Sequence, residues 1–244
     1  MAHDISSSRM GLAPAFDCTR WSLVIALRER PGDNRQPLAE LTANYGYPVY
    51  AYLRWRGFAR DIASRLLQSF FSFLAQEVES TELAVCGRFR DFLFERLQAF
   101  VADQHEVSWS ELRDTSGVDF DNLERRLQSE HSRSSNPETV FTRSFALQVL
   151  LRARTQLRQE TQRSNRQDMF DLLEPSLTRE PDAESIQRLA TTLGISTLAV
   201  QVAIKRLRQR FRQLAEAELQ ETVSNPADLE MERIALFSIL ARPE

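Results

Sequence analysis

Apolar residues recur at intervals of three and four over most of this chain, and convincing alternation of apolar and polar residues is missing. A clear example is the series Leu38, Leu41, Tyr45, Val49 and Tyr52. This period gathers apolar side chains on one face of an α-helix, whereas a half-buried strand requires strict alternation. Only seven glycines occur in 244 residues, which also favours long regular helices. The sequence therefore predicts an all-α fold.

Turn and capping residues divide the periodic stretches into separate helices. Asn136-Pro137 and Asn225-Pro226 each place a capping Asn before a proline at the first helical position, where its missing N–H costs nothing. Pro48 is expected to kink the second helix and Gly57 to close it. We expect helices at about residues 19–30, 37–56, 61–76, 88–102, 123–127, 137–163, 166–177, 183–193, from 197 onward, and 226–240.

These helices predict two helical domains joined by a linker. The expected organisation is a disordered tail (1–15), a four-helix domain (16–103), an acidic linker (104–135), a helix-turn-helix domain (136–218) and a C-terminal helical extension (219–244). Cys18 and Cys86 stand far apart without a Cys or His at ligand spacing, so we expect no zinc site, no disulfide and no cofactor. No stretch approaches the roughly 18 apolar residues of a membrane span, and the N-terminus lacks the features of a signal peptide. We therefore expect a cytoplasmic protein.

Positive charge is concentrated in one segment. Between Ser185 and Ala215 there are six basic residues and no Asp or Glu, so this segment is +6 and the remainder of a chain of net charge -3 is -9. A solvated helix face normally carries both signs. A segregated positive segment is instead typical of an element that binds phosphates.

The same segment has the anatomy of a helix-turn-helix. Leu189 and Leu193 are expected to face inward from its first helix, Gly194 to allow the bend, Ile195 to plug the angle and Ser196 to cap the second helix. The core stripe of the second helix is expected to be Val200, Ile204, Leu207 and Phe211. The residues that we expect to face DNA are Thr197, Gln201, Lys205, Arg206 and Arg208. The alternative is a helical hairpin that is purely structural.

Five motifs in this chain occur in the order found in one family of transcription factors. They are Thr19-Arg20-Trp21-Ser22-Leu23-Val24, Tyr47-Pro48-Val49-Tyr50-Ala51-Tyr52-Leu53 with Gly57, Gln68-Ser69-Phe70-Phe71, Gly87-Arg88-Phe89-Arg90-Asp91-Phe92-Leu93, and Leu189-Ala190 through Leu207-Arg208. From Phe16 to Leu240 the chain thus resembles the extracytoplasmic-function sigma factors of the sigma-70 family, in the variant with an extra C-terminal helix. Each motif is weak individually, and their order makes the resemblance specific.

The resemblance implies a transcription initiation factor whose partners are core RNA polymerase and promoter DNA. The first domain would bind the β′ clamp and the near promoter element, with Arg88 and Arg90 as DNA-binding candidates. The polymerase-binding candidates are Asp61, Ser64, Arg65 and Gln68. The second domain would bind the β flap and read the farther promoter element, and the linker would thread between the two domains.

Two departures from the family pattern qualify these expectations. The family usually carries several carboxylates just before the Gln68 motif, whereas this chain has only Asp61 followed by Ile62-Ala63-Ser64-Arg65. Some sigma factors that this chain resembles lack the same carboxylates and are paired with Ser/Thr kinases, so the resemblance implies that a phosphate supplies the missing charge. The expected site is Ser64, with Ser69 and Thr42 as reserves; the alternative is that Ser64 is an ordinary exposed helix serine. The family's basic run after the fourth helix is replaced by Gln104-His105-Glu106-Val107-Ser108, which weakens the expected contact with the near promoter element.

The sequence also leaves alternative functions open. The main alternative is a sigma-derived regulator that occupies DNA or sequesters a partner without initiating transcription, and an anti-sigma protein is a further expected partner. A response-regulator output module is disfavoured because no α/β receiver domain precedes the helix-turn-helix. An enzyme is not expected, since His3, His105 and His131 lie in tail or linker and no phosphate-binding loop or nucleophile–base pair is apparent.

Overall fold

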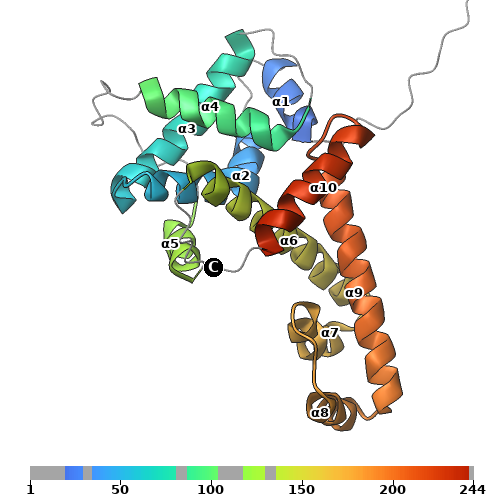
Figure 1. Cartoon of the computed structure of the whole chain (residues 1–244). Coiled ribbons are helices and arrows are strands. Elements are labelled where there is room, and N and C mark those ends of the chain that lie inside the picture. The colour runs from blue at the N-terminus through green and yellow to red at the C-terminus, as the bar shows by residue number, and fades with distance from the viewer. Residues whose placement is uncertain (1–19, 30–34, 81–86, 104–117, 130–135, 242–244) are drawn as a thin grey trace, which may run out of the picture.

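The computed structural model describes residues 20–29, 35–80, 87–103, 118–129 and 136–241 (Figure 1). Within these ranges the chain forms ten α-helices and one described 3-10 helix, and an isolated bridge between Arg88 and Val223 is the only β-type pairing. The predicted all-α class is therefore confirmed. No helix in the described ranges has both the length and the apolar character needed to cross a lipid bilayer.

The helices begin close to the positions that the sequence indicates. The first four are α1 (Arg20–Glu29), α2 (Arg35–Trp55), α3 (Arg60–Ser80) and α4 (Phe89–Asp103). The remaining elements are α5 (Phe120–Ser129), α6 (Pro137–Arg163), α7 (Gln167–Leu173), η3 (Glu174–Leu177), α8 (Ala183–Leu193), α9 (Thr197–Gln220) and α10 (Pro226–Ala241). The single helix expected over 166–177 is split into α7 and η3. Pro175 accounts for the split, because it lacks an N–H and its ring clashes with the preceding helical turn.

Side-chain caps fix the start of the helices that matter most here. The Asn136 side-chain oxygen accepts a hydrogen bond from the Glu138 backbone N–H at 2.9 Å. Asp182 accepts from the Ser185 N–H at 2.8 Å, and this bond is the main cause that lowers the pKa of the Asp182 carboxyl. The Ser196 hydroxyl accepts from the Ala199 N–H at 3.2 Å. Each cap satisfies an N–H that would otherwise lack a partner in the first turn.

The main hydrophobic core joins α1–α4 to parts of α6, α9 and α10. Phe141 and Phe145 of α6 are fully buried in this core. The ring of Phe145 stacks on Tyr45 with the ring centroids 5.5 Å apart, and the ring centroids of Phe141 and Phe94 are 4.9 Å apart. The core therefore does not end at residue 135, where we expected the first domain and its linker to end. Instead, the helix α6, which begins at Pro137, belongs to two cores.

The C-terminal half of α6 leaves the main core and enters a second cluster. Ala153 and Leu157 pack there with Phe170 of α7 and Leu214 of α9. A buried Glu218 on α9 pairs with Arg152 of α6 at 2.8 Å. Figure 1 shows the result: α9 runs from α8 at the bottom of the view to α10, and α6 leads from α1–α4 toward α7. These two long helices connect the main core to the helix-turn-helix.

Part of the expected linker is a helix packed against α2. Leu123 and Leu127 of α5 lie against a small cluster that contains Tyr47 of α2. The Glu124 carboxylate accepts hydrogen bonds from the Tyr50 hydroxyl at 2.6 Å and from Arg54 at 2.9 Å. The Arg54 guanidinium is the main cause that lowers the pKa of Glu124. The rest of the expected linker, residues 104–117 and 130–135, lies outside the described residues.

The last helix packs on α6 and α9 but leaves one apolar face open. Leu236 and Ile239 are buried in the main core, and Leu229 and Leu240 pack against it. In contrast, the side chains of Met231, Ile234 and Phe237 are exposed. The tail residues 1–15, both cysteines and all three histidines lie outside the described residues.

Candidate nucleic-acid interface

Helices α8 and α9 form a helix-turn-helix through a three-residue turn. Gly194 ends α8 with a φ of 65°, a left-handed conformation that glycine adopts without the strain a Cβ would bring. The turn is closed by the Ile195 N–H, which donates to the Ala190 carbonyl at 3.1 Å. Ser196 then caps α9. The sequence predicted both helix boundaries correctly because every determinant lies within a few residues.

The inner side of the motif is a small hydrophobic core. Val200 and Ile204 of α9 are buried against Ala190 of α8 and Leu173 of α7. The further residues of the predicted inward set, Leu189, Leu193, Leu207 and Phe211, are partly buried around this cluster or the adjoining one. The predicted stripe is thus confirmed as the inner face of α9. Ile195 does not plug the angle as expected, because its side chain is 40% exposed.

Four of the five residues expected to face DNA are exposed at the surface of α9: Thr197, Gln201, Lys205 and Arg206. Neither Lys205 nor Arg206 forms an ion pair with a carboxylate among the described residues, and the same holds for Arg212, nearly two helical turns further on. Their charge is therefore available to an anionic partner.

Arg208 is the exception, and its expected role is corrected by the structure. Its guanidinium donates to the backbone carbonyls of Ser176 at 2.7 Å and Arg179 at 3.0 Å, and it also pairs with Glu180. These bonds tie α9 to η3 and to the segment that leads into α8. A guanidinium whose donors are used in this way holds the motif together and is not free to bind a phosphate.

Arg210 is also neutralised within the chain. Its Nε and one terminal nitrogen donate to the Glu160 carboxylate of α6 at 2.8 and 2.6 Å, and the other terminal nitrogen donates to the Gln213 side chain at 3.2 Å. This bidentate pair is the main cause that lowers the pKa of Glu160. The cations of α9 that form no ion pair among the described residues are therefore Lys205, Arg206 and Arg212.

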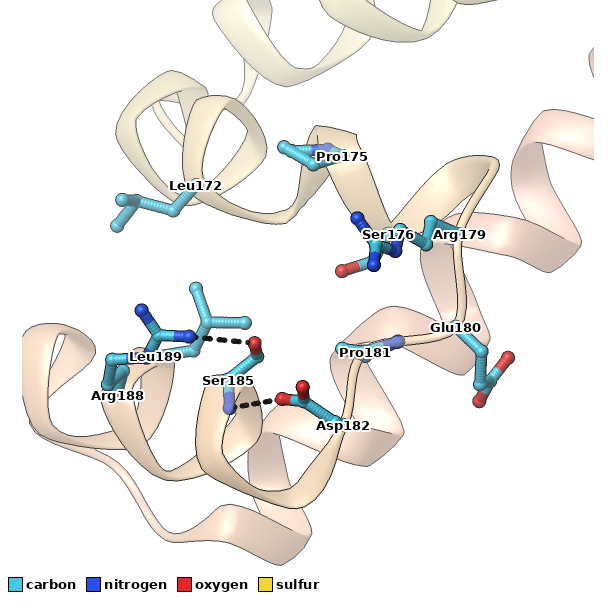
Figure 2. A pocket seen from close by; sticks show the side chains of 10 residues that line it. All are labelled: Leu172, Pro175, Ser176, Arg179, Glu180, Pro181, Asp182, Ser185, Arg188 and Leu189. Atoms are coloured by element: carbon cyan, nitrogen blue, oxygen red, sulfur yellow. Dashed lines mark hydrogen bonds between the residues drawn. The ribbon is translucent and has the colours of Figure 1, made fainter.

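Two hollows flank the motif. One of about 370 Å³ lies between α9 and the approach to α8, lined by Gln201, Lys205, Arg212, Glu180 and Pro181 among others. A second hollow of about 590 Å³ lies between α7–η3 and α8 (Figure 2). There Arg188 donates to the Ser185 hydroxyl at 3.1 Å, while Arg179 shares the lining with Asp182 and Glu180. Charges of both signs line this second hollow, so it has no clear preference for an anion or a cation.

The two arginines expected to bind the near promoter element lie at the junction of α4 with α10. The Arg90 side chain is 5% exposed and makes a bidentate ion pair with Glu232, which is fully buried, at 2.8 and 3.0 Å. The expectation that Arg90 contacts DNA is therefore corrected: burial against Glu232 and Thr142 removes it from the surface. Arg88 is half-buried and pairs with Asp91 at 2.5 Å, so its charge is largely used within the chain.

The polymerase-binding candidates share one face of α3. Asp61, Ser64, Arg65 and Gln68 follow the three-and-four spacing of neighbours on a helix surface. Asp61 and Arg65 are exposed, while Gln68 lines a groove of about 690 Å³ with Arg35, Leu38 and Phe71. Asp61 is the single carboxylate among the four residues. The four residues that the resemblance implied as polymerase-binding candidates therefore do lie next to one another on the surface of α3.

The three phosphorylation candidates differ in access. The Ser64 hydroxyl donates to the Arg60 carbonyl at 2.7 Å and lies at the surface. The Thr42 side chain is 7% exposed and donates to the Leu38 carbonyl at 2.8 Å. The hydroxyl oxygen of Ser69 is buried. Thr42 and Ser69 are therefore corrected as candidates, because a kinase cannot reach either hydroxyl in this fold.

Sequence reasoning missed three features of this region. Leu198 and Val202 lie exposed on α9 among the polar residues, Glu180 binds Arg208, and Glu232 binds Arg90. Only the first had a signal in the sequence, because Ile195, Leu198 and Val202 follow spacings of three and four.

Comparisons of the chain with protein-family models, with curated proteins and with solved structures find no match.

Proposed function

We propose that this chain is a transcription initiation factor of the extracytoplasmic-function sigma type that binds duplex DNA through α8 and α9. One observation carries the DNA-binding part of this proposal. On the exposed face of α9 the charges of Lys205, Arg206 and Arg212 are not neutralised by described carboxylates, and no Asp or Glu occurs from Ser185 to Ala215. A surface of this kind fits the phosphate backbone of DNA.

The roles follow from position along α9. The N-terminal part of a recognition helix enters the major groove, so Thr197 and Gln201 would reach base edges. Lys205 and Arg206, one turn later, would meet phosphates at the edges of the groove. Arg208 would act indirectly, because its bonds to the Ser176 and Arg179 carbonyls orient α9 relative to η3.

The sigma-type role rests on the order of the five motifs along the chain. In this proposal the α3 face of Asp61, Ser64, Arg65 and Gln68 binds the polymerase β′ clamp, and the second domain binds the β flap. The chain would work in the cytoplasm as a non-catalytic partner of core RNA polymerase. A kinase would strengthen the clamp contact by phosphorylating Ser64, since a phosphate adds negative charge to a face that has one carboxylate.

A second candidate is a sigma-derived DNA-binding or partner-sequestering regulator that does not initiate transcription. Two observations favour it. Arg90 is buried against Glu232 and Arg88 is paired with Asp91, so neither arginine is free for the near promoter element. The α3 face also offers the clamp little negative charge.

A run-off transcription assay with core RNA polymerase and fragments of the source genome tests the proposal. We expect discrete transcripts that depend on the chain and that are lost with the double variant Lys205→Ala/Arg206→Ala. The matched control is Arg233→Ala, which removes an arginine of α10, the helix that packs at the end of α9 opposite α8. DNA binding without any transcript would reject the sigma role and favour the second candidate.

The phosphorylation step is tested separately, by the affinity of core polymerase for unmodified chain, kinase-treated chain and kinase-treated Ser64→Ala. We expect tighter binding only for the kinase-treated wild type. Equal affinity for all three would remove phosphorylation from the proposal.

A further inference from the structure

An apolar stripe runs along the outermost side of α9. The exposed fractions of its side chains are 40% for Ile195, 68% for Leu198 and 41% for Val202. With about 100° of rotation per residue, Leu198 and Val202 lie about 160° and 200° around the helix from Val200. Val200 is fully buried. The stripe therefore projects directly away from the core of the motif.

Basic residues border this stripe on both sides. By the same rotation Lys205 lies about 140° from Val200 and Arg206 about 240°, so one falls on each side of the apolar row. No carboxylate occurs on α9 before residue 216. Charge complementarity therefore indicates an occupant that is a polyanion and that also presents apolar groups between two lines of negative charge.

Duplex DNA presents such a combination in its major groove. The phosphates form the two edges, and thymine contributes its C5 methyl group between them. Leu198 and Val202 are one helical turn apart, which is about 6 Å along the axis. Base pairs are spaced by about 3.4 Å, so the two side chains can reach methyl groups about two base pairs apart.

Gln201 strengthens the same assignment. It is three residues from Leu198 and therefore a neighbour on the helix surface. A glutamine side chain binds the N6 and N7 edge of adenine, the base paired with thymine. The polar and apolar groups at the tip of α9 thus match the two halves of an A·T pair.

We propose that Leu198 and Val202 read thymine methyl groups, so that α9 selects DNA with A·T pairs at this position. This inference rests on the proposed function, because it requires that α9 enters the major groove. It adds the chemical feature that is recognised and the residues that recognise it.

The test uses the full chain and a random-sequence pool of duplex DNA. The sequences enriched by binding are synthesised with thymine and, one position at a time, with deoxyuridine, which removes only the methyl group. Burying a group of this size is worth about fourfold in affinity. We expect a loss of about fourfold at each of two thymines for the wild type and no loss at one of them for Leu198→Ala. Val202→Ala should become insensitive at the other.

Controls separate this contact from general effects. Ile234→Ala removes an exposed apolar side chain on α10, which packs at the end of α9 opposite α8, and should keep the full difference between thymine and deoxyuridine. Circular dichroism should be unchanged in Leu198→Ala, because this side chain is mostly exposed.

Two outcomes would overturn the inference while DNA binding persists. The first is wild-type affinity that is unaffected by deoxyuridine, and the second is an unchanged sensitivity in both Leu198→Ala and Val202→Ala. In the first case, weaker binding of Leu198→Ala to core polymerase would make the stripe a protein contact. Enrichment of no DNA sequence at all would instead remove the proposed function itself.

Discussion

The ion pair between Arg90 and Glu232 should be the most sensitive point of the main core. Glu232 is fully buried and Arg90 is 5% exposed, and two hydrogen bonds of 2.8 and 3.0 Å join them. Glu232→Gln keeps the size of the side chain but removes the buried counter-charge, so that only the partly exposed Asp91, at 3.2 Å, still pairs with the guanidinium. Breaking a buried pair by removing one partner costs about 3–5 kcal/mol. We expect Glu232→Gln to lower the free energy of unfolding by about 3 kcal/mol, since the amide still accepts one hydrogen bond.

Urea unfolding followed by circular dichroism measures this loss. A change of about 3 kcal/mol corresponds to a shift of roughly 1–2 M in the urea midpoint for ordinary slopes. The double variant Arg90→Met/Glu232→Leu replaces the pair by apolar side chains, which in buried sites is often neutral or stabilising. We therefore expect the double variant to be more stable than Glu232→Gln.

The control is the neighbouring pair on the same helix. Glu230 and Arg233 are joined across the exposed side of α10, and Glu230→Gln should leave the urea midpoint unchanged. If Glu232→Gln and Glu230→Gln have the same small effect, then α10 does not bury its charge in the main core, and the account of the fold is wrong there.

Three further predictions concern other contacts. Arg208→Ala should lower the thermal stability of the chain because it removes the bonds from α9 to η3, whereas Lys205→Ala should weaken DNA binding at unchanged stability; the opposite pattern would refute the division of roles. The pKa of Glu124 is lowered by Arg54, so its contribution to stability is present above the unfolded-state pKa of about 4.3 and is lost as pH falls through the lower folded-state value. Glu124→Gln should flatten this acid loss of stability in urea titrations, and an unchanged pH profile would contradict the pair. Gly194→Ala places a Cβ at a φ of 65° and should cost about 1 kcal/mol in the free energy of unfolding, so a variant as stable as wild type would argue against this turn.

Local determinants explain which parts of the fold the sequence could predict. The starts of α6, α8 and α9 were correct because their caps, Asn136, Asp182 and Ser196, act within three residues of the helix. Helix periodicity also identified Val200 and Ile204 as buried. These determinants need no knowledge of the rest of the chain.

Tertiary partners were not predictable in the same way. The resemblance implied that Arg90 contacts DNA, but Arg90 is buried against Glu232, a partner 142 residues away in the sequence. The assignment of Phe141 and Phe145 to the main core likewise depends on α2 and α4, which periodicity alone cannot identify as neighbours. A helix that contributes to two cores has no sequence pattern of its own.

The candidate site contains both kinds of feature, those that local determinants predict and those that depend on tertiary partners. Exposure of Gln201 and Lys205 followed from the helical period, but the pairing of Arg208 with Glu180 and two carbonyls depends on the path of the chain before α8. Leu198 and Val202 form a second apolar row on a helix that already has one. Spacing alone cannot decide which row is buried.

The salt dependence of duplex DNA binding tests the central claim most directly. Each phosphate neutralised by a side chain contributes about 0.9 to the slope of log affinity against log salt concentration. The account predicts that the wild-type chain binds duplex DNA and that Lys205→Ala/Arg206→Ala reduces this slope by about 1.8, while Arg233→Ala leaves it unchanged. Duplex binding with the same slope in all three proteins, or no duplex binding by the wild type, would contradict the assignment of α9 as the DNA-binding face.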